Sequence, residues 1–487
     1  MSVLDKLEPR AVWQEFEAIC QVPRPSKKEE KIIQYLLDFG EKHNLETRRD
    51  EIGNVLIKKP ATKGYEDRKT VVLQSHIDMV CEKNEGTEHD FDKDPIVPYI
   101  DGQWVKAKGT TLGADDGIGV AAQLALCIDD TIPHGPLEML FTVDEETGLT
   151  GAFALEKGFF DGKILLNLDS EDEGELFIGC AGGVDTNATF TYKTETTPAN
   201  QVALKLIVKG LNGGHSGDEI DKGLGNSLKL MNRFLWNAME KYEVRLAAFE
   251  GGQARNAIPR EAFAVITIPQ ADKEAVISDF AQYKKDVQAE LKTTEPNLDL
   301  LAEDTDLPEE ILLKTDQFRI VNALYACPHG VYEMSREIDG LVETSTNMAA
   351  IKPSGDKEWL VTTSQRSSVD TAKYDIAHMV ESVFHLADAD VKHTDGYPGW
   401  APDPSSEIVK ITEQSYKELF KVDPIVRAIH AGLECGLFLE KYPYLDMISF
   451  GPTIKGAHTP EERIDIETTK KFWDLLLDVL KKIPADN

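Results

Sequence analysis

The sequence lacks a long apolar run, a cysteine pair at metal-binding spacing and a basic leader. No stretch of its 487 residues approaches the roughly eighteen apolar residues that a membrane-spanning helix needs. The six cysteines are widely scattered without a C-x-x-C pair, which argues against a zinc–thiolate site and favours reduced thiols. The chain begins M-S-V-L-D-K-L-E-P-R, which is not a targeting segment. We therefore expect a cytoplasmic protein that does not enter a membrane.

Positive charge is also scarce. The chain has 53 Lys and Arg against 85 Asp and Glu, a net charge of −32. Such a balance excludes nucleic acid and anionic membranes as main partners, because both attract basic surfaces. The apolar content of 41% is ordinary for a globular protein, and the length predicts two or three domains.

The first third of the chain alternates between helical and strand signals. Short, continuous apolar runs predict strands buried on both faces of a sheet, and the run from Ile118 predicts a buried helix between them. The predicted strands lie near residues 54–59, 71–76, 137–144 and 163–169. The fold class is therefore α/β, with a helix-covered mixed β-sheet.

The texture changes near Gly183, where alternating strands and a charged helical stretch predict an inserted α+β domain. The Pro- and Gly-rich G-Y-P-G-W-A-P-D-P from Gly396 is typical of a returning linker. We predict a catalytic domain made of residues 1–183 and 399–487, with a lid domain at 184–398.

Local signals also predict helix starts. Ser26 with Glu29 forms a capping box, and a further helix is expected from about Asn226. Next to His458, we expect Thr459 as N-cap and Glu462 as its capping-box partner.

Acidic and imidazole side chains recur where predicted strands end. His76 and Asp78 share one face of a strand end, so one can bind a metal while the other orients it. Asp115 and Asp116 follow a glycine turn. For Asp116, capping the following helix is as good an interpretation as a role at the site, whereas Asp115 suits a carboxylate that bridges two cations. Open α/β sheets carry their ligands at the carboxyl ends of strands. Carboxylates and imidazoles gathered there can hold two divalent cations, so the pattern predicts a two-metal hydrolase.

Glu145 and Glu146 are adjacent after a predicted strand. On an extended segment they would point oppositely, so one can bind metal while the other takes a proton from a metal-activated water. Asp169 ends another strand, where a lone aspartate is often only a turn former. His458 alone would be taken for a surface histidine. Only the whole series indicates a metal site.

The segments together resemble a known family, the co-catalytic zinc peptidases of the carboxypeptidase G/aminoacylase type. The similarity covers nearly the whole chain and is greatest to the bacterial cytosolic aminoacyl-histidine (Xaa-His) dipeptidases. It is carried by H-I-D-M-V, T-L-G-A-D-D-G-I-G, D-E-E-T-G-L-T-G-A, G-L-N-G-G-H-S-G, R-N-A-I-P-R-E, H-A-G-L-E-C-G and G-P-T-I-K-G-A-H-T-P.

The resemblance implies two divalent cations per subunit, zinc first, with manganese or cobalt also suited to such ligands. One cation would be held by His76 and Asp169 and the other by Glu146 and His458, with Asp115 bridging. Glu145 would be the general base and later the proton donor, and Asp78 would orient His76. In relatives the Asp115–Asp116 peptide is cis.

The resemblance also implies that the insert is a lid that forms a homodimer. His215 would stabilise the oxyanion in a partner subunit's active site, and Asn256 and Arg366 would contact the substrate. His430 lies where relatives place a substrate-lining loop. Competitors for binding the substrate carboxylate are Arg255, Arg260 and Arg336. Either Asp116 or Glu171 could bind the substrate amine.

The expected activity is hydrolysis of dipeptides such as carnosine and other unblocked dipeptides. An aminoacylase or carboxypeptidase of the same clan is the alternative, since these differ only in pocket lining. An inactive metal-binding scaffold would need a missing ligand or base, and every expected residue is present.

Overall fold

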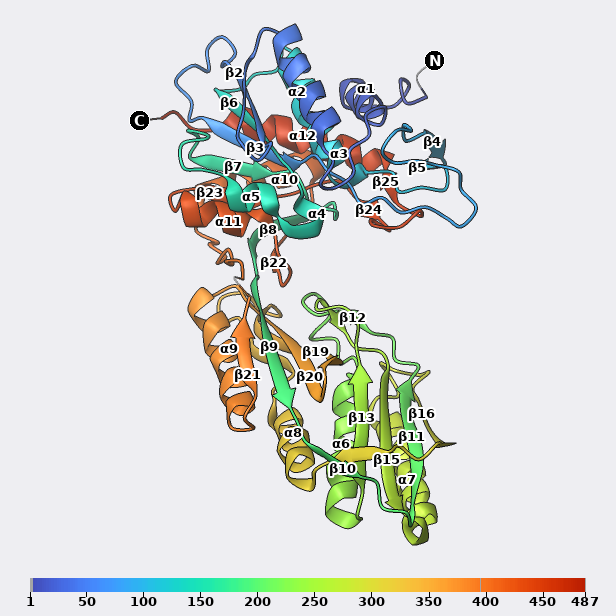
Figure 1. The fold of residues 1–487 in the computed structure, drawn as a ribbon. Coiled ribbons are helices and arrows are strands. Elements are labelled where there is room, and N and C mark those ends of the chain that lie inside the picture. Colours follow the sequence, from blue (N-terminus) through green and yellow to red (C-terminus); the bar gives the residue numbers. More distant parts are fainter. Residues whose placement is uncertain (1–2, 395, 487) are drawn as a thin grey trace. The chain divides into compact units, whose positions relative to one another are not determined.

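The computed structural model describes residues 3–394 and 396–486, which form two compact units. The first unit comprises the chain up to Cys180, Trp400–Ala428 and the chain from Leu433 onward. The second comprises Ala181–Gly399 together with Ile429–Gly432. Figure 1 draws both units in sequence colours. Among the described residues, no helix combines the length and apolar character that crossing a membrane requires.

The first unit is built on a mixed eight-stranded sheet. In sheet order its strands are β1 (Glu46–Arg49), β2 (Val55–Lys59), β6 (Leu137–Thr142), β3 (Val71–His76), β7 (Ile164–Asn167), β23 (Asp446–Ser449), β8 (Glu175–Cys180) and β22 (Ile425–Ile429). The central strands β6, β3, β7 and β23 are parallel, whereas β1–β2, β2–β6 and β23–β8 pair antiparallel. Every residue of β3, β6 and β7 is buried, as their continuous apolar runs predict.

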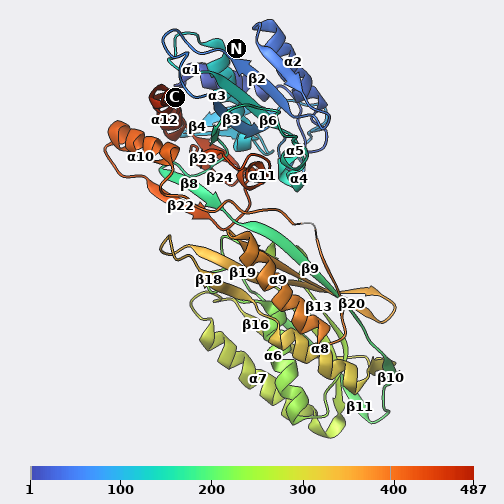
Figure 2. The same ribbon diagram turned by 90° about the vertical axis from the view of Figure 1, so that its left-hand side faces the viewer.

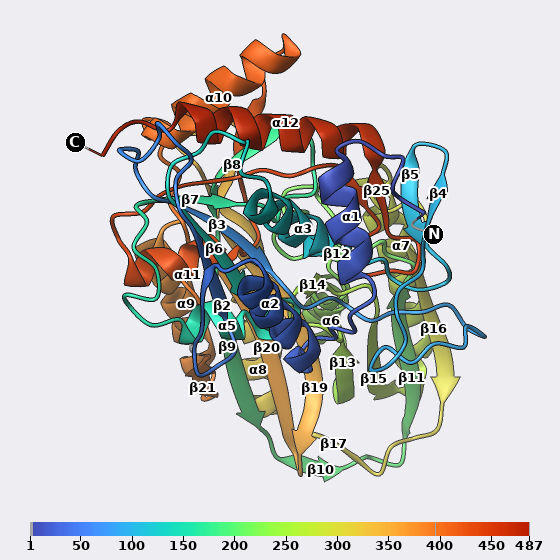
Figure 3. The same cartoon turned by 90° about the horizontal axis from the view of Figure 1, so that it is seen from above.

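Helices cover this sheet. They are α1 (Arg10–Ile19), α2 (Glu30–Lys42), α3 (Ala114–Ile128), α10 (Glu407–Phe420), α11 (Glu434–Lys441) and α12 (Ile466–Lys482), with the short α4 (Glu145–Gly148) and α5 (Thr150–Ala154). Figure 3 shows α3 beside α1, and α3 also packs on β3. A smaller sheet contains β24 (Ile454–Lys455), β25 (Arg463–Asp465), β5 (Trp104–Ala107) and β4 (Pro98–Asp101). The predicted α/β class is confirmed.

Three of the parallel strands end at the same edge of the sheet. Because β3 pairs in parallel with both β6 and β7, their carboxyl ends lie together. Asp78, Glu145 and Asp169 each follow one of these strands within three residues. The strand order therefore gathers the acidic residues that the sequence places after separate strands.

The second unit carries a nine-stranded antiparallel sheet. Its strands are β16 (Asp299–Thr305), β11 (Gln201–Lys209), β15 (Ala262–Pro269), β13 (Arg245–Gly251), β19 (Val342–Gly355), β20 (Glu358–Ser367), β9 (Gly182–Thr191) and β21 (Asp390–His393), with β18 (Gly330–Met334) paired to β19. Two short pairs are β10 (Thr194–Thr196) with β17 (Glu310–Leu312) and β12 (Gly214–His215) with β14 (Ala257–Ile258).

Helices α6 (Ser227–Lys241), α7 (Lys273–Glu290), α8 (Lys314–Ala326) and α9 (Asp370–His385) pack on this sheet, and a 3₁₀ turn, η1 (Gln270–Asp272), precedes α7 (Figure 2). Their shared core includes the buried Phe190, Phe249 and Trp359. Helix α6 starts where the sequence predicts, and Asn226 caps it, its side chain accepting the N–H groups of Leu228 and Lys229.

Two predicted helix caps are wrong. Helix α2 begins at Glu30, and its cap position is Glu29, not Ser26. The Ser26 hydroxyl instead donates to Asp78 Oδ2 at 2.8 Å, across 52 residues of sequence. A long-range hydrogen bond thus engages the side chain that the local sequence pattern assigns to the helix N-terminus.

The second wrong cap lies after His458. Residues 458–462 form a turn that leads into β25, and the following helix, α12, starts only at Ile466 with Asp465 as its cap. Thr459 therefore caps no helix. The buried Glu462 carboxylate accepts backbone N–H groups from the first residue of α3 and the two residues before it.

Candidate metal centre

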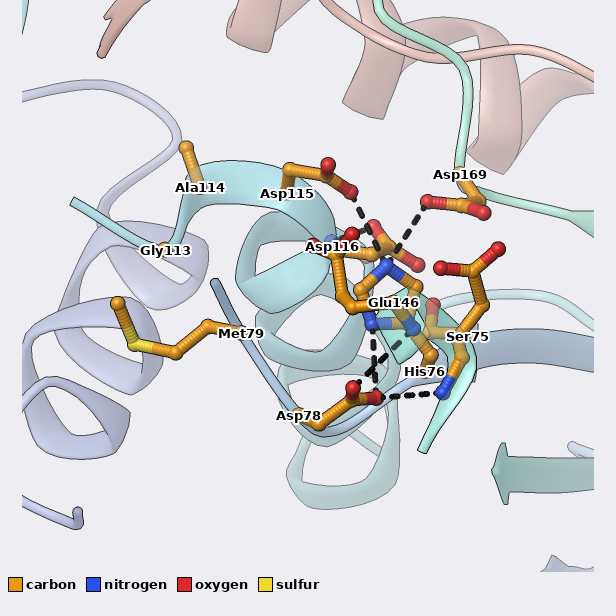
Figure 4. Close-up of polar contacts among 12 residues, drawn as sticks. Ser75, His76, Asp78, Met79, Gly113, Ala114, Asp115, Asp116, Glu146 and Asp169 are labelled. Carbon is orange, nitrogen blue, oxygen red and sulfur yellow. Dashed lines mark hydrogen bonds and ion pairs between the residues drawn. The ribbon is translucent and has the colours of Figure 1, made fainter. Parts of the chain in front are cut away.

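His76, the last residue of β3, faces acidic side chains on both ring nitrogens. Nε2 lies 3.0 Å from Asp115 Oδ1 and 3.3 Å from Asp169 Oδ1, whereas Nδ1 lies 3.3 Å from Asp78 Oδ1. Figure 4 shows Asp115 and Asp169 directed at one nitrogen, with Asp78 at the other. Asp78 can only accept, so it favours a proton on Nδ1. The carboxylates of Asp169 and Asp115 outweigh burial and raise the pKa of His76 well above its usual range, so a cation bound there would replace a proton on Nε2.

The second oxygen of Asp115 faces a different histidine. Asp115 Oδ2 lies 3.2 Å from His458 Nε2, and that nitrogen lies 2.9 Å from Glu146 Oε2. Two groups of possible ligands therefore share Asp115: one with His76 and Asp169, the other with Glu146 and His458. The structure brings together all five side chains that the sequence predicts as metal ligands, although they come from five separate segments.

The segment that carries Asp115 is held by two long-range contacts. Glu462 accepts the N–H groups of Leu112 at 2.6 Å, Gly113 at 2.9 Å and Ala114 at 2.7 Å. The buried Arg24 donates to the carbonyls of Asp78 and Gly113. The peptide between Asp115 and Asp116 is cis. Because Glu462 lies four residues after His458, it links two ligand segments directly.

Gly113 allows Arg24 to lie close to the backbone of this segment. Its φ of +67° favours glycine, and a Cβ there would lie 2.6 Å from Arg24 Nη2 and 2.8 Å from Met79 Sδ. Figure 4 labels Gly113 and Met79 beside the site.

Glu145 and Glu146 lie in the one-turn helix α4, so the extended segment assumed from the sequence is wrong. They still diverge, because successive residues of a helix are rotated by about 100°. Their backbone N–H groups donate to the two oxygens of Asp78, at 3.0 Å and 3.2 Å. Asp78 therefore contacts His76 and also fixes the turn that presents both glutamates.

The electrostatics of the site fit divalent cations. Burial, and then the neighbouring Asp115 carboxylate, raise the pKa of Asp169 to about 7. Hydrogen bonding to Asp115 and Glu146 raises the pKa of His458 to about 11. Glu146 Oε1 is buried without a hydrogen-bond partner. Converging carboxylates and an unused buried oxygen indicate a shortage of positive charge, which bound cations would supply.

A buried glutamate that the sequence argument did not assign lies beside this group. Glu434, at the start of α11, accepts hydrogen bonds from Gln74 Nε2 at 2.5 Å and Thr142 Oγ1 at 2.8 Å. Burial, together with the charges of Asp169 and Asp78, raises its pKa to about 8. It belongs to the motif H-A-G-L-E-C-G, but the sequence singled out only the histidine of that motif.

The predicted substrate residues gather within the second unit. His215 pairs with Ala257 across β12 and β14, which places Asn256 beside it; Asn256 O accepts the N–H of Ser216. The charge of Arg366 lowers the pKa values of both His215 and His430, although burial is the larger cause at each. His430 Nε2 lies 2.8 Å from Ser345 Oγ.

Comparison with known proteins agrees with this chemistry. A model described as Peptidase family M20/M25/M40 matches residues 72–482. The chain belongs to this family. The resemblance to co-catalytic peptidases is thereby confirmed, as is the prediction of a hydrolase. Peptidases of this family use divalent metals, and the two groups around Asp115 supply candidate ligands.

Two relatives are similar over their full length. The chain is 45% identical over 486 residues to a protein called cytosol non-specific dipeptidase from Escherichia coli K12, covering all of both chains. It is 46% identical to aminoacylhistidine dipeptidase from Vibrio alginolyticus, whose crystal structure superimposes with a TM-score of 0.91 and 99% coverage of both chains. Aminopeptidase PepT from Bacillus cereus, 16% identical with a TM-score of 0.57 and coverage of 98% and 99%, shares the fold.

Proposed function

We propose that the protein is a dinuclear metal-dependent dipeptidase that cleaves unblocked dipeptides, Xaa-His among them. The observation that carries the proposal is Asp115, whose two oxygens face His76 and His458 in two separate ligand groups. The names of the Escherichia coli and Vibrio alginolyticus relatives support the dipeptide substrate, and the former supports a cytosolic location.

We assign one cation to His76, Asp115 and Asp169, and the other to Asp115, Glu146 and His458. The donors are imidazole nitrogens and carboxylate oxygens, which suit zinc, with manganese or cobalt as alternatives. When bound, such cations polarise a carbonyl and lower the pKa of water toward about 7.

Glu145 is the proposed base. Burial, and then the charges of Asp169, Glu434 and Glu146, raise its pKa well above the usual range. A carboxylate with a raised pKa can take a proton from the attacking water and return it to the leaving amine. The peptide bond then breaks, giving a free carboxylate and a free amine. Asp78 acts by holding both His76 and the backbone of Glu145.

His215 is the proposed oxyanion donor. Its Nδ1 accepts the N–H of Asp218 at 3.1 Å and lies 3.3 Å from the N–H of Gly217, so the ring proton belongs on Nε2. Burial, and then the charge of Arg366, lower its pKa to about 4, which keeps the ring neutral near pH 7. A neutral imidazole with a free Nε2–H can donate to a developing oxyanion.

Arg366 is the proposed partner of the substrate carboxylate, with Asn256 and His430 lining the same subsite. Its buried Nε has no hydrogen-bond partner, while Nη1 donates to Tyr397 at 3.0 Å. Its competitors Arg255 and Arg260 are engaged with Asp185 Oδ2 and Leu211 O. A buried guanidinium with an unused donor suits a bidentate carboxylate.

We further propose a homodimer formed through the second unit, in which His215 serves the partner's metal centre. A complementation experiment tests this arrangement. His215→Ala and Glu145→Gln proteins, each inactive alone, are mixed and allowed to exchange subunits. With equal amounts of the two proteins, about half of the dimers are mixed, and each mixed dimer has one complete site of two. About a quarter of wild-type activity should therefore return. No recovery, with exchange demonstrated by mass-tagged subunits, would show that His215 acts within its own chain.

Substrate class is tested with a panel of free dipeptides, carnosine included, against N-acetyl amino acids and longer peptides, with metal content measured on the same samples. Turnover of dipeptides with two bound cations supports the proposal. Turnover of N-acetyl amino acids alone would identify an aminoacylase, and release of C-terminal residues from longer peptides would identify a carboxypeptidase.

A further inference from the structure

A second group of imidazole and carboxylate side chains lies in the second unit, apart from every ligand described above. Helix α9 carries His378, Glu381 and His385 at spacings of three and four residues, which place them on one helical face. Strand β21 ends at His393 and packs against α9 (Figure 1). His378 is exposed, whereas Glu381 and His393 are half-buried.

The donor atoms are close enough to share one ion. One ligand atom each from His378, Glu381 and His393 lies within 4.8 Å of the other two. His393 Nε2 is 3.3 Å from Glu381 Oε2. Zinc bound by nitrogen and oxygen at about 2.0–2.1 Å in a tetrahedron separates its ligands by about 3.3 Å. His393 and Glu381 already have that separation, and a nitrogen of the exposed His378 lies within 4.8 Å of a donor atom on each.

Buried hydrogen bonds fix which nitrogen of His393 carries the proton. The Thr363 hydroxyl donates to the carbonyl of Thr186, so its oxygen accepts from the Gln365 amide nitrogen at 2.8 Å. The Gln365 amide oxygen consequently faces Thr186, whose hydroxyl donates to it at 2.7 Å. The Thr186 oxygen is left to accept from His393 Nδ1 at 3.0 Å.

This chain of donors gives neutral His393 a lone pair on Nε2, directed at the Glu381 carboxylate. Thr186, Thr363 and Gln365 are fully buried, so water does not replace these partners. In the neutral ring this lone pair repels a carboxylate oxygen at 3.3 Å, and either a proton on Nε2 or a metal ion between the two atoms removes that repulsion. A hydrogen-bonded Nδ1–H that orients Nε2 is also the usual arrangement of a metal-binding histidine.

We propose that His378, Glu381 and His393 form a third metal site, selective for a divalent transition metal such as zinc. Two imidazoles and one carboxylate are borderline donors that favour zinc over magnesium or calcium. The ion would link α9 to β21, two elements that flank β9. His385 lies 3.1 Å from the other oxygen of Glu381 and is not one of the three donors.

The test counts zinc on intact protein. Wild type and His378→Ala/His393→Ala are dialysed against micromolar zinc, and bound metal is measured by mass spectrometry. The double variant is expected to hold one ion fewer than wild type and to retain dipeptidase activity. Because the test compares the zinc content of two proteins, its result does not depend on how many ions the main centre binds. Equal zinc content in the two proteins would overturn the proposal, because a proton on His393 would then satisfy the pair.

Two further variants separate metal binding from folding. Thr186→Val removes no ligand but abolishes the acceptor for His393 Nδ1–H, so zinc affinity for the third ion should fall by about 10–100-fold. His385→Ala removes a neighbouring imidazole outside the three-donor set and should keep the ion. Unchanged affinity in Thr186→Val, or loss of the ion in His385→Ala, would overturn the assigned donor atoms.

Discussion

Asp78 Oδ1 lies 3.3 Å from His76 Nδ1 while the same carboxylate accepts the N–H groups of Glu145 and Glu146. Burial alone would raise the pKa of Asp78, but hydrogen bonds from His76, from Glu145 N–H and from Ser26 lower it. The side chain is thus held as a carboxylate. It contacts His76, one of the predicted metal ligands, and the α4 turn that carries the proposed base.

Replacing Asp78 should therefore weaken both metal binding and catalysis. In Asp78→Asn an NH₂ group replaces one acceptor oxygen, so the α4 turn loses the acceptor of one N–H group. His76 loses its partner as well if Oδ1 is the oxygen replaced. We expect metal affinity to fall by about 10–100-fold, with kcat reduced more than KM is raised. Metal titration and steady-state kinetics measure the two effects. Ser26→Ala, which removes one hydroxyl and leaves the carboxylate, is the matched control and should change both much less.

The adjacent glutamates of α4 should respond differently to the same substitution. Glu145→Gln removes the proposed base and should lower kcat by about 10²–10⁴-fold with both cations still bound. Glu146→Gln should instead lose the cation shared with His458 and Asp115. Metal content measured beside kcat distinguishes the two. An active Glu145→Gln enzyme would contradict the base assignment, and full metal content in Glu146→Gln would contradict the ligand assignment.

The sequence predicts this arrangement well where chemistry sits at strand ends. Asp78, Glu145 and Asp169 follow continuous apolar strands, and parallel pairing brings such ends together without further information. The local cap signals fail for an equally physical reason. Ser26 and Glu462 satisfy hydrogen-bonding partners 52 and about 350 residues away, and a local window does not contain those partners. The sequence argument misses Glu434 for the same reason, because its partners Gln74 and Thr142 lie on strands β3 and β6, far away along the chain.

Glu462 should contribute to both stability and metal binding. Glu462→Ala leaves the N–H groups of Leu112, Gly113 and Ala114 buried without acceptors, at about 1–3 kcal/mol for each group that finds no water. We expect the free energy of unfolding of the first unit to fall by about 3 kcal/mol. The affinity for the cation between Asp115 and His458 should fall as well. Urea unfolding and metal titration measure these changes.

The exposed neighbour Glu461 supplies the control for this variant. Glu461→Ala should stay within about 0.5 kcal/mol of wild type, because it removes no buried contact. If Glu462→Ala were equally mild, the link between the two ligand segments would be unimportant for the fold.

The pH dependence of stability should report on His430. Burial, and then the charge of Arg366, lower the pKa of His430 to about 3, whereas an unfolded histidine has a pKa of about 6.5. The unfolded chain therefore binds the proton first as pH falls. The stability from neutral His430 is complete above about pH 6.5 and is lost progressively as pH falls toward 3.

His430→Gln removes this titration and keeps a polar group beside Ser345. The unfolding free energy of wild type minus that of the variant should decrease by about 1.4 kcal/mol per pH unit between pH 6 and pH 4. Urea unfolding of both proteins at matched concentration measures the difference, in which the many titrating carboxylates common to both cancel. A difference that does not change with pH would mean that His430 titrates alike in the folded and unfolded chains. Burial and the charge of Arg366 would then not keep the ring uncharged in the folded chain.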